Sequence, residues 1–161
     1  MGIFDAKDLA NYIYKYYDNR YSRPISPIKM QKSLYFLFAY WGGYVRKAND
    51  NMKNVECDVA TLPEEILFDN KIEAWTYGPV IPDIYTIMNS IDGRNGVENV
   101  EQSEIRDFID DVLDDIFVIS DFKLVDISHM DEAWKRHYKK EALHHNEEIP
   151  KEEIIKEYAT R

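Results

Sequence analysis

The chain has 161 residues, 45% of them hydrophobic and 14% aromatic, which predicts a single domain over 1–161 with one hydrophobic core. Its formal net charge of −10 repels phosphate backbones, which argues against direct nucleic-acid binding and leaves a protein partner as the easier expectation. A single cysteine, Cys57, excludes an internal disulfide, and without a signal-peptide pattern or an apolar run of bilayer length we expect a cytoplasmic protein with no membrane contact.

Two helices are predicted at the start of the chain. Asp5 is a suitable N-cap for the first helix, with Asp8 in its first turn. Pro24 ends a polar loop, and Ser26 with Pro27 is typical of the cap and first turn of the second helix. The apolar stripe of the first helix consists of Leu9, Ile13, Tyr16 and Tyr17, with Tyr12 and Tyr14 off this stripe.

The second helix is predicted to be the centre of the core. From Leu34 to Trp41 the sequence LYFLFAYW is apolar throughout, and a helix that is hydrophobic on all sides is buried. Gly42 and Gly43 follow, where they either weaken the helix or let another backbone approach it closely. Residues 48–65 begin with several Asn and Asp residues, and they are predicted to form an irregular connection.

A hairpin and a corner are predicted next. Ile66–Phe68 and Ile72–Trp75 are the two short strands, separated by a polar turn at residues 69 and 70. Gly78 and Pro79 follow the second strand, and their unusual backbone preferences predict a tight corner there. The next helix has Pro82 in its first turn and apolar residues at helical spacing, namely Ile84, Ile87, Met88 and Ile91.

The last third of the chain is predicted to be helical after a loop at 92–96. Ser103 can cap the helix with the cleanest amphipathic pattern, and Ser120 and Asp131 begin two shorter helices. A closing helix follows Pro150, with Ile154, Ile155 and Tyr158 facing inward. A solvated face of the amphipathic helix carries Asp110, Asp111, Asp114 and Asp115. The predicted fold class is therefore mainly α (α+β): a compact bundle of about six or seven helices around a central apolar helix, with one small antiparallel β-hairpin.

One group of residues could support acid–base chemistry. His129 follows a helix end and has Asp126 and Asp131 nearby, which could orient the imidazole for proton transfer in a small hydrolase. A single histidine beside a helix cap is more often a structural hydrogen-bonding residue. Cys57 lies in a polar segment without a local base, so the sequence shows no partnered nucleophile.

A second group could bind a metal. His144 with Glu148, or Glu141 with His145, places two ligands one helical turn apart, a spacing that can hold zinc. The more common explanation is an exposed, charged helix end. No cysteine pair, HExxH-type pattern or Gly-rich phosphate loop supports a metal or nucleotide site, so we expect no cofactor and no metal.

Three stretches of the sequence resemble the SocA-like Panacea domain, also called the phage-associated GepA-like family. They are SPIKMQKSLYFLFAY (26–40), IEAWTYGPVIPDIY (72–85) and ISHMDEAWKR (127–136). The tail EEIPKEEIIKEY (147–158) is similar to the closing helix of that family, so the resemblance covers nearly the whole chain. The middle stretch is the most specific and contains Ala74, Trp75, Gly78, Pro79, Val80, Pro82 and Tyr85.

The resemblance implies a helical domain with a small sheet, found in phage, prophage and toxin–antitoxin loci. Members of the family act as antitoxins that neutralise toxins by protein contact, and one branch is a proteolytic adaptor that delivers its toxin to a ClpXP-type protease. A phage protein that binds a host target is a further alternative, and a homo-oligomer is compatible with each of them. No enzymatic activity is implied. The longer connection at 48–65 departs from the family. We expect neither the extra N-terminal DNA-binding domain of some relatives nor direct operator binding.

We expect the middle stretch, residues 72–85, which we call the central motif, to act mainly as scaffold. Its residues have bulky shapes or restricted backbones that set the corner between the hairpin and the next helix, and a Cβ at Gly78 is predicted to clash. Tyr77 is the exception, since it flanks the corner and its hydroxyl could reach a partner. The predicted scaffold residues are Trp75, Gly78, Pro79, Val80, Pro82, Tyr85, His129 and Trp134.

Overall fold

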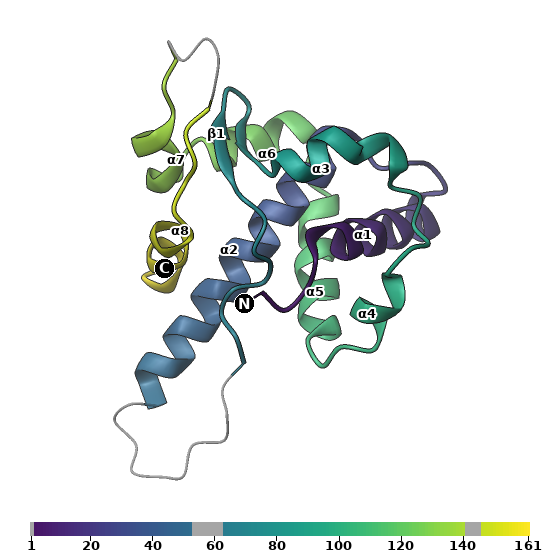
Figure 1. Ribbon diagram of the computed structural model, residues 1–161, viewed down its shortest axis with the longest axis horizontal. Helices are drawn as coiled ribbons and strands as arrows, with labels where there is room; N and C mark the ends of the chain where they lie inside the picture. The colour runs from purple at the N-terminus through teal and green to yellow at the C-terminus, as the bar shows by residue number, and fades with distance from the viewer. Residues whose placement is uncertain (1, 53–62, 141–145) are drawn as a thin grey trace.

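The computed structural model describes residues 2–52, 63–140 and 146–161. A long helix, α2 (Pro27–Met52), crosses the molecule, with α7 and α8 on one side and α1, α4 and α5 on the other (Figure 1). The other elements are α1 (Ala6–Tyr21), β1 (Glu73–Trp75), β2 (Gly78–Val80), α3 (Pro82–Ile87), the 3-10 helix η1 (Met88–Ser90), α4 (Val97–Glu101), α5 (Arg106–Phe117), α6 (Asp121–Ser128), α7 (Glu132–His137) and α8 (Lys151–Ala159). The predicted fold class, mainly helical with one small antiparallel sheet, is confirmed.

Helix α2 is the centre of the hydrophobic core, as its sequence predicts. The Ser26 hydroxyl accepts the backbone N–H of Lys29 at 3.0 Å and caps the helix, and Leu34, Leu37 and Phe38 are fully buried. The helix continues to Met52, so the irregular connection predicted from residue 48 is wrong for 48–52. Salt bridges from Arg46 in the last turns, to Glu65 and Glu152, help to hold this polar end helical. Residues 53–62, which include Cys57, lie outside the described part of the chain.

Two adjacent glycines let α8 pack against the backbone of α2. A Cβ at Gly42 would lie 2.6 Å from Cγ1 of Ile155, and one at Gly43 would lie 2.7 Å from Cβ of Tyr158. Of the two alternatives that the sequence left open for these glycines, close approach of another backbone is the one observed. Pro150 precedes α8, and the predicted inward residues of that helix, Ile154, Ile155 and Tyr158, are buried.

The predicted strand at 72–75 is present as β1, but it pairs with a different partner from the predicted one. β1 pairs antiparallel with β2, with Trp75 opposite Gly78, so the segment predicted to be a corner is itself a strand. Ala74, which lies opposite Pro79, donates its N–H to the carbonyl of Glu147 on the outer edge of β1 and not to β2. The two residues therefore form a non-hydrogen-bonded pair, in which β1 needs no N–H from Pro79. The predicted first strand, Ile66–Phe68, instead accepts backbone N–H groups of the N-terminal segment.

Helix α5 begins later than predicted. The Ser103 hydroxyl donates to the carbonyl of Val100 at 2.8 Å and ends α4, a short helix that the sequence analysis missed. Ser103 is therefore not the cap of α5, which begins at Arg106. The amphipathic prediction itself is confirmed, because Ile109 and Leu113 are fully buried. The predicted apolar helix after Pro82 is also shorter than its spacing suggested, since α3 ends at residue 87.

The acidic face of α5 is not simply solvated. Asp110 accepts the hydroxyl of Tyr12 at 2.5 Å, and Asp114 accepts the hydroxyl of Tyr16 at 2.7 Å and a hydrogen bond from Arg20. Tyr12 is buried although it lies off the predicted stripe, because this pairing satisfies its hydroxyl. Burial and the bond to the Asp110 carboxylate raise the pKa of Tyr12.

A buried carboxylate joins α2, α7 and the end of the chain. Asp131, at the start of α7, is 1% exposed and accepts hydrogen bonds from the hydroxyls of Tyr35 and Tyr158 and from the guanidinium of Arg161. Burial and the Asp131 carboxylate raise the pKa of both tyrosines, so both hydroxyls stay protonated and donate. We call this group the Asp131 cluster.

Among the described helices, none combines the length and the apolar composition needed to cross a membrane.

Helix α6 begins after Ser120, whose hydroxyl accepts the N–H of Lys123 at 3.3 Å, as predicted. The end of α6 lies beside β2, and this contact places the hairpin next to α2 and α6. The hairpin, α2 and α3 therefore converge on one region of the surface.

Candidate functional site

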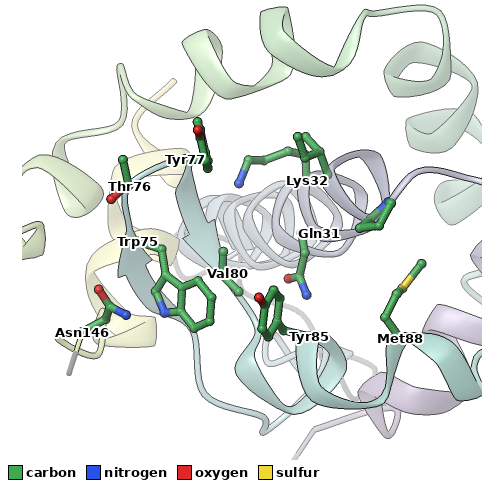
Figure 2. Close-up of a pocket in the computed structure, with 11 residues that line it drawn as sticks. Gln31, Lys32, Trp75, Thr76, Tyr77, Val80, Tyr85, Met88 and Asn146 are labelled. Carbon is green, nitrogen blue, oxygen red and sulfur yellow. The ribbon is translucent and has the colours of Figure 1, made fainter. Parts of the chain in front are cut away.

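A cavity of about 470 Å³ lies where α2, the hairpin and α3 meet (Figure 2). This volume is within the range of pockets that hold small molecules in proteins. The lining is mainly apolar and aromatic, and much of it comes from the motif that carries the family resemblance. We call this cavity the motif pocket, and its principal lining residues are Lys32, Trp75, Tyr77, Val80, Tyr85 and Met88.

The aromatic wall of the pocket comes from β1, the hairpin turn and α3. The rings of Trp75 and Tyr85 meet edge to face with their centroids 4.9 Å apart, and the indole N–H of Trp75 donates to Glu73 at 2.9 Å. Tyr77 and Tyr85 are each 59% exposed at the rim. The wall therefore offers large aromatic surfaces to solvent from the hairpin and from α3.

Gly78 brings the hairpin close to α2 and α6. Its φ is +105°, a backbone conformation that disfavours a side chain, and a Cβ there would lie 2.3 Å from Oγ of Ser128. The same Cβ would lie 3.1 Å from Nζ of Lys32. The predicted clash at Gly78 is therefore present in the structure, and its causes are a buried hydroxyl on α6 and a buried amine on α2.

Lys32 is the polar residue at the floor of the pocket. The residue is 1% exposed, and its Nζ donates to the carbonyl of Pro79 at 2.9 Å. Among the residues that the structure describes, no carboxylate forms a salt bridge with it. Burial penalises the charged amine and lowers the pKa of Lys32 to about 7. Figure 2 shows the side chain reaching from α2 toward Tyr77 and the hairpin.

Gln31 fixes the wall beside Lys32. Its amide nitrogen donates to the carbonyl of Ile81 at 3.2 Å, and its amide oxygen accepts the N–H of the same residue at 2.8 Å. The side chain thus pairs with both backbone groups of one residue, as a neighbouring strand would. This pairing ties the end of β2 to α2 and uses one donor and one acceptor of the Gln31 amide.

His129 and Trp134 support the hairpin from behind. The ring nitrogen Nε2 of His129 hydrogen-bonds the carbonyl of Thr76 at 2.9 Å, and the indole of Trp134 donates to the carbonyl of Trp75 at 2.9 Å. The two rings stack with centroids 4.2 Å apart. His129 makes no hydrogen bond with Asp126 or Asp131 in the described structure, so the predicted proton-transfer arrangement is not formed.

Asp131, the proposed orienting carboxylate, is instead engaged in the Asp131 cluster. The contacts of His129 match the alternative explanation, a structural hydrogen-bonding residue.

Only one of the four predicted metal ligands lies in the described part of the chain. Glu148 forms an isolated β-bridge with Glu73, and Glu141, His144 and His145 lie outside the described residues. Within 2–52, 63–140 and 146–161, no group of three or more acidic, His or Cys side chains could hold a metal.

The sequence analysis missed Lys32, although a signal for it exists. Lys32 lies four residues after Ile28 and three and four residues before Tyr35 and Phe36, so helical periodicity places it on an apolar face. A lysine on such a face is buried unless its side chain extends to water. The missing information is tertiary: the hairpin covers this part of α2 and prevents the amine from reaching solvent.

Comparison with known proteins adds nothing to these observations. No family model, curated protein or solved structure matches the chain. The resemblance to the SocA-like Panacea domain therefore stays a prediction, and the functional argument depends on the geometry of the pocket.

The motif residues divide into two groups by position. Gly78, Pro79 and Val80 are buried in β2, where a scaffold role would place them. Trp75, Tyr77 and Tyr85 line the pocket, and the latter two are exposed. Pro82 opens α3 at its first turn, as predicted. One stretch of the chain thus builds both the frame and the surface of the pocket.

We predict that Gly78→Ala lowers the free energy of unfolding by about 1 to 3 kcal/mol, through the strained φ and the close contact with Ser128. Chemical denaturation measures the change. A matched double variant separates the two causes: in a Ser128→Ala background the contact with Oγ is gone, so Gly78→Ala costs less. Equal losses in both backgrounds would show that the contact contributes nothing.

We also predict that Lys32→Met stabilises the fold at neutral pH. Below about pH 7 the lysine is charged in both the folded and unfolded states, so the cost of burying the charge is fully present. Between pH 7 and 10 the folded lysine is neutral while the unfolded lysine still binds a proton, so the stability of the parent rises. The advantage of Lys32→Met should shrink by roughly 1.4 kcal/mol per pH unit over this window.

Denaturation curves from pH 6 to pH 10 measure this difference directly. Lys7→Met is the control, because Lys7 is an exposed lysine on α1 that pays no cost of burial. A stability difference between Lys32→Met and the parent that does not change with pH would contradict the assignment of a lowered pKa to Lys32.

Proposed function

We propose that this chain is a non-enzymatic protein-binding module, an antitoxin that neutralises a cognate toxin in the cytoplasm by direct contact. The observation that carries the proposal is the rim of the motif pocket, where Tyr77 in the hairpin turn and Tyr85 on α3 are exposed. The hairpin is held by hydrogen bonds from Gln31 and Trp134. Tyrosine is enriched at binding surfaces because it offers a large apolar ring with a polar tip and loses little side-chain entropy.

The chemistry around the pocket supports binding rather than catalysis. Within the part of the chain that the structure describes, Lys32 donates to the carbonyl of Pro79, and Ser128 donates its hydroxyl proton to the carbonyl of Val125 at 2.8 Å, so neither group is hydrogen-bonded to the other. His129 is committed to the backbone of the hairpin turn. A catalytic site needs a nucleophile, a base and an orienting group within hydrogen-bond reach of each other. These side chains do not form such a set, and binding requires no cofactor.

Two further features support a protein partner, and a toxin in particular. The net charge of −10 favours encounter with a basic protein through complementary fields. The motif that resembles the Panacea domain, a domain of antitoxins, supplies much of the pocket wall. The partner that this proposal requires is a toxic protein encoded beside this chain.

The experiment is co-expression of this chain with the protein encoded next to it, followed by growth assays and a binding titration of the purified pair. We expect growth arrest by the neighbour alone and rescue by the parent chain. Tyr77→Ala should weaken binding at least about tenfold, as loss of a well-packed aromatic contact does at other interfaces, while the melting temperature changes little because the side chain is exposed.

Tyr44→Ala is the matched control. Tyr44 is also 59% exposed, but it lies on α2 against Phe108, away from the motif pocket. Rescue and affinity should be unchanged in this variant. A harmless neighbour, or toxicity that persists with the parent chain present, would contradict the antitoxin proposal. Equal loss of affinity in both tyrosine variants would contradict the assignment of the surface.

A further inference from the structure

The motif pocket places a buried amine at the end of an apolar cavity. Lys32 is 1% exposed and donates to one backbone carbonyl, that of Pro79, whereas an ammonium group has three donors. A buried charge without a partner is costly, and natural proteins rarely keep one that serves no purpose. The same helix position would accept methionine or leucine by volume, so packing alone does not require a lysine.

The fold covers this amine by means of an unusual backbone conformation at Gly78. Gly78 adopts φ +105°, and a side chain at that position would approach Nζ of Lys32 to 3.1 Å and Oγ of Ser128 to 2.3 Å. The hairpin thus needs a glycine in order to cover the amine while leaving its tip beside the cavity (Figure 2). A strained backbone and a buried, unpaired charge at one pocket are together typical of a ligand site.

Several other polar groups of the wall already have partners. Both amide atoms of Gln31 pair with the backbone of Ile81, and the indole N–H of Trp75 donates to Glu73. Pro79 has no N–H, and its carbonyl accepts from Lys32. A peptide backbone carries an N–H and a C=O group at nearly every residue, and the mainly apolar lining offers few partners for them, which is unfavourable. A ligand with one polar end and an apolar body avoids that penalty.

The charge of the Lys32 amine determines which polar group the ligand carries. A single lysine can neutralise one negative charge, so a carboxylate fits better than a phosphate, which carries about two charges at neutral pH. The aromatic wall selects the body: the rings of Trp75 and Tyr85 can pack against a flat or branched hydrocarbon group. A cavity of about 470 Å³ is suitable in size for such a molecule.

We propose that the motif pocket binds a small apolar carboxylic acid, with its carboxylate against Nζ of Lys32 and its hydrocarbon body between Trp75, Val80 and Tyr85. This site goes beyond the protein-binding proposal and does not depend on it, because the acid occupies the floor of the pocket and the partner contacts the rim. Failure of the toxin experiment would leave this site untouched, and failure of the ligand experiment would leave the antitoxin proposal untouched.

The test uses 3-phenylpropanoate and its neutral counterpart 3-phenylpropanamide, titrated into the full chain and followed by two-dimensional NMR. We expect the acid to bind the parent at least ten times more tightly than the amide and to shift the indole signal of Trp75. The indole of Trp41 is an internal control, because it donates to the carbonyl of Glu64 away from the pocket. In Lys32→Met the acid should lose its advantage and bind no better than the amide.

Lys29→Met is the matched variant. Lys29 is the other buried lysine of α2, but it does not line the pocket and its Nζ donates to the carbonyl of Phe117 at 3.1 Å. This variant should keep the preference for the acid. Equal affinity of the parent for acid and amide, or no shift of the Trp75 signal by either, would overturn the proposal without reference to any variant. Tighter binding of a peptide that ends in phenylalanine than of the free acid would overturn the assignment to a small molecule.

Discussion

The left-handed backbone at Gly78 is the constraint on which the pocket depends. At φ +105° the chain passes between the hydroxyl of Ser128 and the amine of Lys32 without a side chain in the way. This passage lets β2 lie against α2, where the carbonyl of Pro79 accepts from Lys32 and Gln31 pairs with Ile81. The exposed aromatic residues of the hairpin turn and of α3 take their positions from that arrangement.

Asp131 and Lys32 are both buried charged residues, but the fold compensates their burial to different degrees. Asp131 is surrounded by two tyrosine hydroxyls and the Arg161 guanidinium, which compensate its burial and join three helices. Lys32 has one carbonyl partner, so its burial is only partly compensated and its pKa falls to about 7. The first arrangement is structural. The burial of Lys32 costs stability. Because Lys32 lies beside the motif pocket, we assign it a role in binding.

Local signals predicted much of the fold. The caps at Asp5, Ser26 and Ser120 were identified correctly because a capping bond joins residues two or three positions apart. The buried centre of α2 was also identified, because an apolar run on all sides of a helix has one explanation. Ser103 has the same composition signal as the true caps, but its hydroxyl donates to Val100 instead.

Tertiary pairing accounts for what the sequence did not reveal. The second strand of the hairpin was missed because Gly78 and Pro79 are poor strand residues, and only the outer bond from Ala74 to Glu147 makes the proline acceptable. The site was predicted in part: Tyr77 lies exposed at the rim, but the lysine at the floor could not be recognised before the hairpin was known to cover it. The acidic residues of α5 were likewise assigned to solvent, because the tyrosines that pair with them lie nearly a hundred residues earlier.

Hydrogen–deuterium exchange of the chain, alone and with the protein encoded beside it, tests most directly whether the motif pocket is the binding surface. The amides of 73–88, which include the hairpin and α3, should become protected when the partner is added. The apolar groove on the opposite part of α2, lined by Tyr40, Tyr44 and Phe108, should exchange at the same rate in both samples. Protection of that groove, with unchanged exchange over 73–88, would contradict the assignment of the partner surface to the motif pocket.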